Sequence, residues 1–381
     1  MPVRIPIARP DLGEAEWTAA RKVIESGWVT QGPRVAEFET AIAEMSGAAH
    51  AVAVSSCTTA LHLALICAGV GRDDEVIVPS MSFIATANTI VHAGATPVFA
   101  EVDPATFNLD IDDVRTRINT RTRAILLVHQ LGLPADIDAF QELARRHGLH
   151  LIEDAACAIG SRYNDRPIGS HSDLVCFSFH PRKVLTTGDG GMITTTSADY
   201  AARLRLLRQH GMSIPDTVRN ASDKVLRESY VEVGYNYRMT DLQAAVGLAQ
   251  IERLPAILER RHNLARRYDE AFRGHDLIAP LVVPQGASWN VQSYPVRLRG
   301  FDADRRDRVM QDLLDLGIAT RPGVMTAHRE PAYSHLGVSL PRSEAASDGS
   351  VILPMYTDLT PADQSEVVQA LMTAVRTHGR R

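Results

Sequence analysis

The sequence predicts an α/β fold in which a large, mixed and mostly parallel seven-stranded sheet is followed by a smaller α+β part. Two observations support this prediction. From about residue 50 to residue 195, short β-branched runs alternate with segments of helical apolar periodicity, the pattern of crossover units in a parallel sheet. After Thr240 the chain changes to long helical segments rich in Arg and Glu. We therefore expect a large domain over residues 1–250, including the N-terminal segment, and a small C-terminal domain over residues 251–381.

The elements of the expected large domain follow from local pattern. Seven runs are short, apolar and rich in β-branched residues, as strands are: Ala51–Val54, Glu75–Val78, Pro97–Ala100, Arg123–Val128, His150–Glu153, Leu174–Phe179 and Gly191–Thr195. Five segments have 3.6-residue apolar spacing, and several of them end at a glycine: Val35–Met45, Thr58–Ala68, Ile84–His92, Ile137–Arg146 and Ala198–Arg208. These elements account for one sheet with helices packed against it.

The rest of the chain is patterned less regularly. The stretch Met212–Ser229 is polar and predicts a mobile loop. Two long helices are expected at Leu242–Leu254 and Ile257–Phe272, followed by a strand at Ser293–Leu298. The expected smaller α+β part then consists of the segment Arg305–Leu316, a strand-like stretch at Ala319–Arg321 and a final helix at Ala362–Thr377.

Composition excludes several classes of protein. The 381 residues carry 40 Lys and Arg against 45 Asp and Glu, so no bulk positive charge exists to bind nucleic acid or an anionic membrane. Apolar stretches such as Ala124–Val128 are too short to cross a bilayer, and the first residues lack the apolar core of a signal peptide, so we expect a cytoplasmic protein. The four cysteines form no C-x-x-C pair, so we expect reduced thiols and no metal site.

The most informative segment places an acid and an amine at neighbouring strand ends. Asp154 follows one apolar strand, and Lys183 follows the next. In an open α/β sheet the carboxyl ends of strands border the ligand crevice, so both side chains are expected in one pocket. There the lysine can form a Schiff base with an aldehyde cofactor, and the acid can keep a pyridine nitrogen protonated. The alternative is that Asp154 caps a helix and Lys183 is a solvated cation.

A third element supports a cofactor with a phosphate group. Ser55–Leu61 is a hydroxyl-rich turn between a strand and a helix, and free N–H groups at a helix start bind phosphate. Ser178 could add a further hydroxyl. Phe83, at the next strand-to-helix turn, could lie flat on the cofactor ring. The alternatives are simple N-capping for the turn and a core position for Phe83.

These motifs resemble the DegT/DnrJ/StrS-type sugar aminotransferases, pyridoxal 5′-phosphate (PLP) enzymes with the aspartate-aminotransferase fold (fold type I). The resemblance runs in order from Gly27–Pro33 to Leu353–Tyr356. The blocks that carry it are Ser56–Leu61, Asp74–Pro79, Gly94–Phe99, Glu153–Ala156, Ser178–Lys183, Thr187–Gly191 and Gly234–Met239.

The resemblance implies a role for each matching residue. Lys183 is the Schiff-base lysine, and Asp154 is the partner of the pyridine nitrogen. The expected cofactor-binding set is Ser56, Cys57, Thr58, Phe83, Asp154, Cys157, Ser178, Lys183 and Asn236, the last reaching the phosphate of the neighbouring subunit in a homodimer with shared active sites. We also expect substrate contacts from Trp28, Thr30, Arg238 and His328. The alternative is that these four residues have structural roles only.

Three positions depart from the family pattern. Cys157 stands where the family has a glutamine that binds the 3′ oxygen of the cofactor, a contact that a thiol makes poorly. Cys57 replaces a glycine of the phosphate turn, which a contact through the backbone N–H tolerates. Asp189 replaces the commoner glutamate, with no consequence that we can derive.

The resemblance implies a transaminase that moves an amino group from an amino acid, L-glutamate, to a keto sugar linked to a nucleotide. A lysine at its ordinary pKa of about 10.4 is a poor base at neutral pH, so we expect the imine and burial together to lower the pKa of Lys183. Three alternatives stay open: a transaminase for a keto-cyclitol, a sugar dehydratase, and a non-catalytic PLP-binding regulator. In the dehydratases the lysine position is a histidine, so Lys183 argues against that branch. No basic helix or helix-turn-helix pattern supports a DNA-binding regulator.

Overall fold

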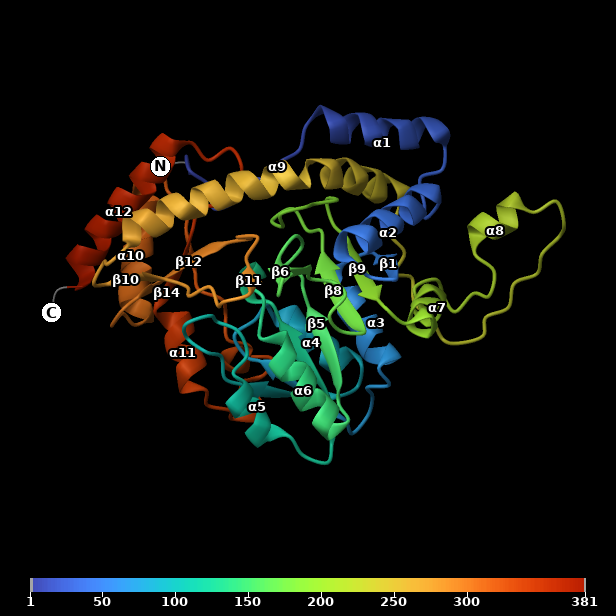
Figure 1. The fold of residues 1–381 in the computed structure, drawn as a ribbon, viewed down its shortest axis with the longest axis horizontal. Coiled ribbons are helices and arrows are strands. Elements are labelled where there is room, and N and C mark those ends of the chain that lie inside the picture. The colour runs from blue at the N-terminus through green and yellow to red at the C-terminus, as the bar shows by residue number, and fades with distance from the viewer. Residues whose placement is uncertain (1–2, 380–381) are drawn as a thin grey trace.

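The computed structural model describes residues 3–379, apart from the side chain of Asp216, and has a seven-stranded sheet at its centre (Figure 1). All neighbouring strands pair in parallel except where β9 runs antiparallel to β1 and to β8. The strand order is β1 (His50–Val54), β9 (Gly191–Thr195), β8 (Leu174–Ser178), β5 (His150–Asp154), β4 (Thr122–Val128), β2 (Glu75–Pro79) and β3 (Thr96–Ala100). The predicted mixed, mostly parallel sheet is confirmed.

Helices cover both faces of this sheet. Successive residues of β4 point to opposite faces, with Leu126 in one apolar cluster and Leu127 in the other. One face packs against α3 (Cys57–Cys67), α4 (Ile84–His92) and α7 (Ala198–Leu207); the other packs against α2 (Pro33–Ser46), α5 (Ile111–Arg117) and α6 (Ile137–His147). Within residues 3–379 no helix combines the length and apolarity needed to span a membrane.

A single long helix, α9 (Asp241–Phe272), connects the two halves of the chain. The expectation of two separate helices is wrong, because the helix continues through Pro255. That proline is exposed, while Leu254 and Ile257 on either side of it pack in the core, so apolar packing opposes the break that the lost hydrogen bond favours. Helix α1 (Glu14–Ser26) lies along α9 (Figure 1). The expected boundary after residue 250 falls inside α9, and the division into domains stays a prediction.

The C-terminal part is built on an antiparallel sheet of β10 (Ile278–Pro280), β12 (Tyr294–Leu298), β14 (Ser350–Leu353) and β13 (Arg321–Pro322). Helices α10 (Ala303–Asp315) and α12 (Pro361–Gly379) share an apolar cluster with this sheet, and Ile5 from the N-terminal segment joins that cluster. Three short strands, β6 (Arg162–Tyr163), β7 (Arg166–Pro167) and β11 (Ala287–Ser288), form a third sheet.

The stretch after α7 extends away from the rest of the molecule as an arm, residues 212–233 (Figure 1). The expectation of an irregular loop is incomplete, because the arm contains helix α8 (Asp216–Ala221). An isolated bridge between Met212 and Tyr230 closes its base.

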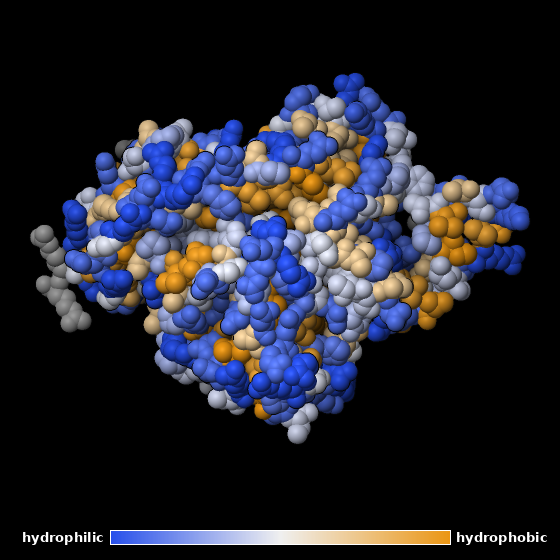
Figure 2. All heavy atoms as spheres, viewed as in Figure 1, coloured by the Kyte–Doolittle hydropathy of each residue, from blue (hydrophilic) through white to orange (hydrophobic). Residues whose placement is uncertain are grey.

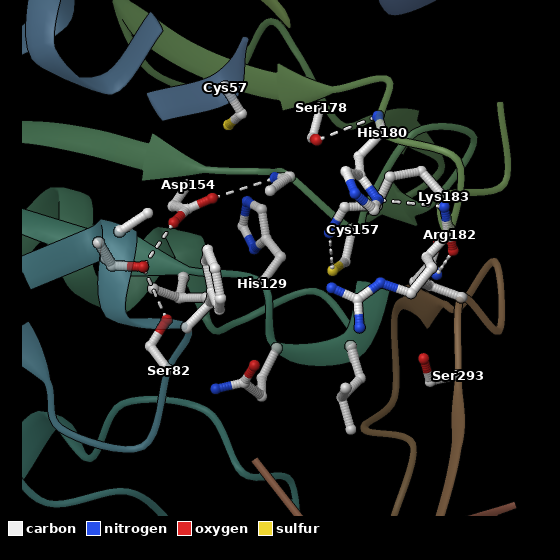
Figure 3. Close-up of a pocket in the computed structure, with 18 of the residues that line it drawn as sticks. Cys57, Ser82, His129, Asp154, Cys157, Ser178, His180, Arg182, Lys183 and Ser293 are labelled. Atoms are coloured by element: carbon white, nitrogen blue, oxygen red, sulfur yellow. Dashed lines mark hydrogen bonds between the residues drawn. The ribbon is translucent and has the colours of Figure 1, made fainter. Parts of the chain in front are cut away.

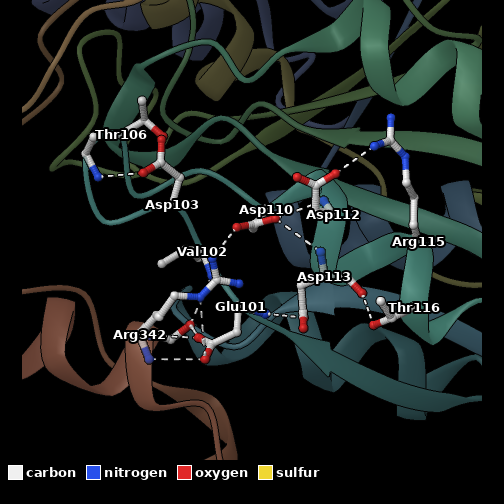
Figure 4. A network of polar contacts seen from close by, with 12 residues as sticks. Glu101, Val102, Asp103, Thr106, Asp110, Asp112, Asp113, Arg115, Thr116 and Arg342 are labelled. Carbon is white, nitrogen blue, oxygen red and sulfur yellow. Dashed lines mark hydrogen bonds and ion pairs between the residues drawn. The ribbon is translucent and has the colours of Figure 1, made fainter.

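A carboxylate of the central sheet fixes α11 (Pro341–Asp348), the helix that leads into β14 (Figure 4). Glu101 accepts hydrogen bonds from the backbone N–H of Ser343 at 2.8 Å, the hydroxyl of Ser343 at 2.6 Å and the backbone N–H of Arg342 at 3.1 Å. A negative charge at a helix N-terminus is stabilising. Glu101 therefore ties the C-terminal sheet to the central one.

We expect Gly191→Ala to disturb the start of α3. A Cβ atom at this position would stand 2.4 Å from the carbonyl atoms of Ser56 and 2.6 Å from the backbone nitrogen of Cys57, so the backbone must shift. Overpacking of this kind lowers the free energy of unfolding by about 1–3 kcal/mol, which denaturant unfolding measures. Gly71→Ala is the control, since no atom lies within 4 Å of its added Cβ. Equal stability of the two variants would contradict the expectation.

Candidate active site

A cavity of about 370 Å³ lies at the carboxyl ends of the parallel strands, between the central sheet and the C-terminal sheet. This is the edge where open α/β sheets bind ligands, and the volume is that of a small-molecule site. The residues expected to bind the cofactor within one chain all line it: Ser56, Cys57, Thr58, Phe83, Asp154, Cys157, Ser178 and Lys183.

Asp154 ends β5 and is only 4% exposed. Its Oδ1 accepts a hydrogen bond from the backbone N–H of Ala156 at 3.1 Å, and its Oδ2 accepts one from the hydroxyl of Thr86 at 3.0 Å (Figure 3). Burial raises the pKa of this carboxyl above its ordinary value, although both hydrogen bonds and the charge of Lys183 oppose the shift. A cationic group placed against Asp154 in the cavity would therefore stabilise its charged form.

Lys183 lies in the turn after β8, on the other side of the cavity from Asp154 (Figure 3). Its Nζ donates a hydrogen bond to Sγ of Cys157 at 3.1 Å. Burial lowers the pKa of the amine, but Cys157, Cys57 and Asp154 together outweigh burial and hold the pKa above its ordinary value. In the chain without cofactor the net pKa of Lys183 is therefore raised, contrary to the expectation from burial, and the expected lowering by the imine stays a prediction.

The turn between β1 and α3 presents free backbone donors to the cavity. Ser56 is the N-cap of α3, and its hydroxyl accepts a hydrogen bond from the backbone N–H of Thr59 at 3.2 Å. Among residues 3–379 the backbone N–H groups of Cys57 and Thr58 have no hydrogen-bond acceptor. Ser178, at the end of β8, lines the same cavity. The turn can therefore bind a phosphate group.

Phe83 precedes α4 and is 64% exposed, although it lines the cavity. The alternative that Phe83 is a core residue is therefore wrong. An exposed aromatic ring at a cavity wall is available to stack on a planar ligand.

Five residues predicted for the site lie outside the lining of this cavity: Trp28, Thr30, Asn236, Arg238 and His328. Both ring nitrogens of His328 are engaged within the chain, one by the hydroxyl of Ser80 at 2.5 Å and the other by Glu344 at 3.0 Å. Asn236 is exposed. The expected roles of all five residues stay predictions.

Sequence reasoning missed four residues that line the cavity: Thr86, His129, Arg182 and Arg321. Thr86 lies one helical turn after Phe83, and that spacing could have indicated it. His129 directly follows the apolar run of β4, so the strand-end argument used for Asp154 applies to it as well. Arg321 comes from β13 of the C-terminal sheet, and no local signal places it here.

The residues present fit PLP, which has an aldehyde, a pyridine nitrogen and a phosphate. An amine, a carboxylate and the free N–H groups of α3 border one cavity, and Gly191 allows close backbone approach to Ser56. Burial and the charge of Asp154 raise the pKa of Cys57 well above its ordinary value, so its thiol stays neutral beside a phosphate. Cys157 contacts Lys183, so its expected weakness toward the 3′ oxygen stays a prediction.

Comparisons with known proteins find relatives over nearly the whole chain. The model of the DegT/DnrJ/EryC1/StrS aminotransferase family matches residues 10–372. GDP-perosamine synthase of Caulobacter vibrioides is 42% identical over 374 residues, which are 97% of each chain. The structure of Spr1654 of Streptococcus pneumoniae has been solved in a PMP form and in a PLP form. The PMP form superposes on this chain with a TM-score of 0.93 at 29% identity, and the match covers 98% of this chain and 100% of Spr1654. The aminotransferase TlmJ of Streptoalloteichus hindustanus has a TM-score of 0.91 at 36% identity, over 99% of this chain and all of that one.

We expect Asp154→Asn to stabilise the protein without cofactor, increasingly as pH rises. Because the pKa of Asp154 is raised on folding, the folded state favours the protonated carboxyl, and stability falls as pH rises above about 4, the unfolded value. An amide avoids this cost: its oxygen can accept from Ala156, and its NH₂ can donate to Thr86, whose hydroxyl then donates to Ser82, 2.8 Å away.

Thermal unfolding of the cofactor-free proteins across the pH range measures this difference. Asp276→Asn is the control, since that carboxyl is exposed and lies outside both the cavity and the arm. A difference between wild type and Asp154→Asn that does not change with pH would contradict the expectation.

Proposed function

The chain belongs to the DegT/DnrJ/EryC1/StrS aminotransferase family, and on this premise we propose that it moves an amino group from L-glutamate to a nucleotide-linked keto sugar. Membership confirms the resemblance found in the motifs and makes the chain a PLP-dependent aminotransferase. The nucleotide linkage is supported by a relative named for a GDP-linked product, GDP-perosamine synthase. Glutamate as the donor is carried over from the family resemblance.

One observation carries this proposal: Lys183 and Asp154 line a single cavity together with the free N–H groups at the start of α3. When bound, PLP supplies an aldehyde that takes up the amino group and a pyridine ring that withdraws electrons from the substrate carbon. Lys183 would hold the aldehyde, and Asp154 the pyridine nitrogen. The turn at Ser56 and the hydroxyl of Ser178 would hold the phosphate, and Phe83 would cover the ring.

The side chains of this protein would have separate roles in the reaction. Nζ of Lys183, once displaced by the incoming amine, is placed to remove and return a proton at the substrate carbon. Asp154 must stay ionised to keep the ring nitrogen protonated, and Thr86 and Ala156 hold its two oxygens in place. Apolar residues from the C-terminal sheet, Ile352 and Leu353, close the cavity and limit the access of water.

The visible absorbance of the cofactor-loaded protein tests the proposal. We expect glutamate to bleach it and a keto sugar nucleotide to restore it, and screening keto sugar nucleotides against keto-cyclitols identifies the acceptor. Lys183→Ala should cut turnover by about 10²–10⁴-fold, because the anchoring amine and the base are lost together. Lys22→Ala, which removes an exposed lysine, is the control. Turnover of Lys183→Ala within about tenfold of wild type, about 1.4 kcal/mol of barrier, would contradict the assignment.

The same measurement separates the alternatives. A non-catalytic regulator would bind the cofactor without bleaching by glutamate. A transaminase for a keto-cyclitol would bleach but recover its absorbance only with the cyclitol. A dehydratase would release the sugar hydroxyl as water and would need no amino donor, and Lys183 argues against it.

We further propose a homodimer with shared active sites, which two observations support. Asn236 is exposed and lies outside the lining of its own cavity, so its side chain is available to a second copy. Apolar side chains gather on the arm (Figure 2), where Val225 is 93% exposed and Val233 is 88% exposed. Packing of the arm on a second copy would cover them and would bring Asn236 to the phosphate of that copy.

Subunit mixing tests the shared site. Lys183→Ala and Asn236→Asp homodimers should both be inactive, since the new carboxylate repels the phosphate. A mixture should recover about a quarter of wild-type activity, because half of the dimers carry one intact site in two. Native mass spectrometry verifies subunit exchange. Exchange without recovery of activity, or an active monomer in sedimentation, would overturn the dimer proposal.

A further inference from the structure

Two arginines from different parts of the fold border the cavity of Lys183 without a carboxylate partner. Arg182 directly precedes Lys183 in the turn after β8, and Arg321 lies on β13 of the C-terminal sheet. Both are exposed, and within residues 3–379 neither forms an ion pair with Asp or Glu. In Figure 3, Arg182 lies on the same side of the cavity as Lys183 and His180.

The two arginines line the same cavity, and their positive charges disfavour each other. Burial lowers the pKa of Arg321, and the charge of Arg182 lowers it further. Like charges that share a site without a counterion are unfavourable, and an anion bound there relieves the repulsion.

The remaining charged groups of the cavity do not neutralise this pair. Two acids line the cavity, and within residues 3–379 neither forms an ion pair with Arg182 or Arg321: Asp154 accepts hydrogen bonds from Thr86 and Ala156, and Asp189 accepts one from the backbone N–H of Gly190 at 2.8 Å. Burial and the charge of Arg182 lower the pKa of His180, so its ring is uncharged at neutral pH. The free positive charge beside Lys183 therefore belongs to Arg182 and Arg321.

The backbone beside Arg182 is fixed, although its side chain is free. Oε1 of Gln292 accepts a hydrogen bond from the backbone N–H of Val184 at 2.9 Å, and its Nε2 donates one to the carbonyl of Arg182 at 2.5 Å. In the C-terminal sheet, Arg321 of β13 pairs with Ile352 of β14. The backbone that carries each guanidinium group is thus held by hydrogen bonds, and a fixed backbone preorganises a binding site.

We propose that Arg182 and Arg321 form an anion-binding pair that holds the acidic group of an incoming substrate while its reacting carbon lies near Lys183. The proposal rests on the proposed function, which offers two sources of such a group: the carboxylate of the amino donor and the diphosphate of the acceptor. Guanidinium groups suit both, because their planar donors match carboxylate and phosphate oxygens. The cofactor phosphate is a separate ligand, bound at the start of α3.

Binding measurements on cofactor-loaded protein test the pair without requiring turnover. The variants are Arg182→Gln, Arg321→Gln and the double change, and the control is Arg308→Gln, which removes an exposed arginine from α10. Calorimetry with glutarate, a dicarboxylate without an amine, reports the donor site, and GDP reports the diphosphate site. We expect at least about tenfold weaker binding of one or both probes in each single variant, with PLP affinity unchanged.

Each outcome has one meaning. If only glutarate binds more weakly, the pair binds the amino donor. If only GDP binds more weakly, the pair binds the acceptor. If both bind more weakly, donor and acceptor share the site. Wild-type affinity for both probes in the double variant, no measurable binding of either by wild type, an equal loss in Arg308→Gln, or a matching loss of PLP affinity would overturn the proposal. Failure of the proposed function shows separately, because wild type would then not be bleached by glutamate.

Discussion

The parallel alignment of β5 and β8 is the constraint on which the site depends. Because both strands end at the same edge of the sheet, Asp154 and the turn that carries Lys183 border one cavity, although they are distant in sequence. The start of α3 joins them because β1, two strands away from β8, points the same way. Crossover connections thus bring together an acid, an amine and free backbone donors that lie far apart in the sequence.

Burying charged groups in this cavity is unfavourable for folding, and these are the groups that would take part in the reaction. Burial raises the pKa of Asp154, and Nζ of Lys183 is engaged only by the thiol of Cys157 among the hydrogen bonds of the described residues. A bound ring with a protonated nitrogen supplies the charge partner that Asp154 lacks, so cofactor binding and stability are coupled. Active sites commonly trade stability for function in this way. Arg182 and Arg321, which form no ion pair with an acid among residues 3–379, would extend the same principle to the substrate under the proposed anion-binding role.

Sequence pattern predicted the sheet well because its signal is local. Each of the seven expected strands is present, as is Ile84–His92 with its expected bounds. The break expected near Pro255 is absent, because packing of α9 on both sides of the proline outweighs the lost hydrogen bond. Arg321 could not be predicted, since its approach to the cavity depends on how the C-terminal sheet packs against the central one. The proposed role of Asn236 depends on a second chain, which local pattern does not describe.

The central claim is that Lys183 is the residue to which the cofactor is covalently bound. The chain has three lysines, and Lys22 and Lys224 are both exposed. Treating the cofactor-loaded protein with borohydride makes that bond permanent, and mass spectrometry of a digest then locates the modified lysine. The account predicts one modification per chain, in the peptide that contains Lys183. Modification at Lys22 or Lys224 with Lys183 unmodified would contradict it.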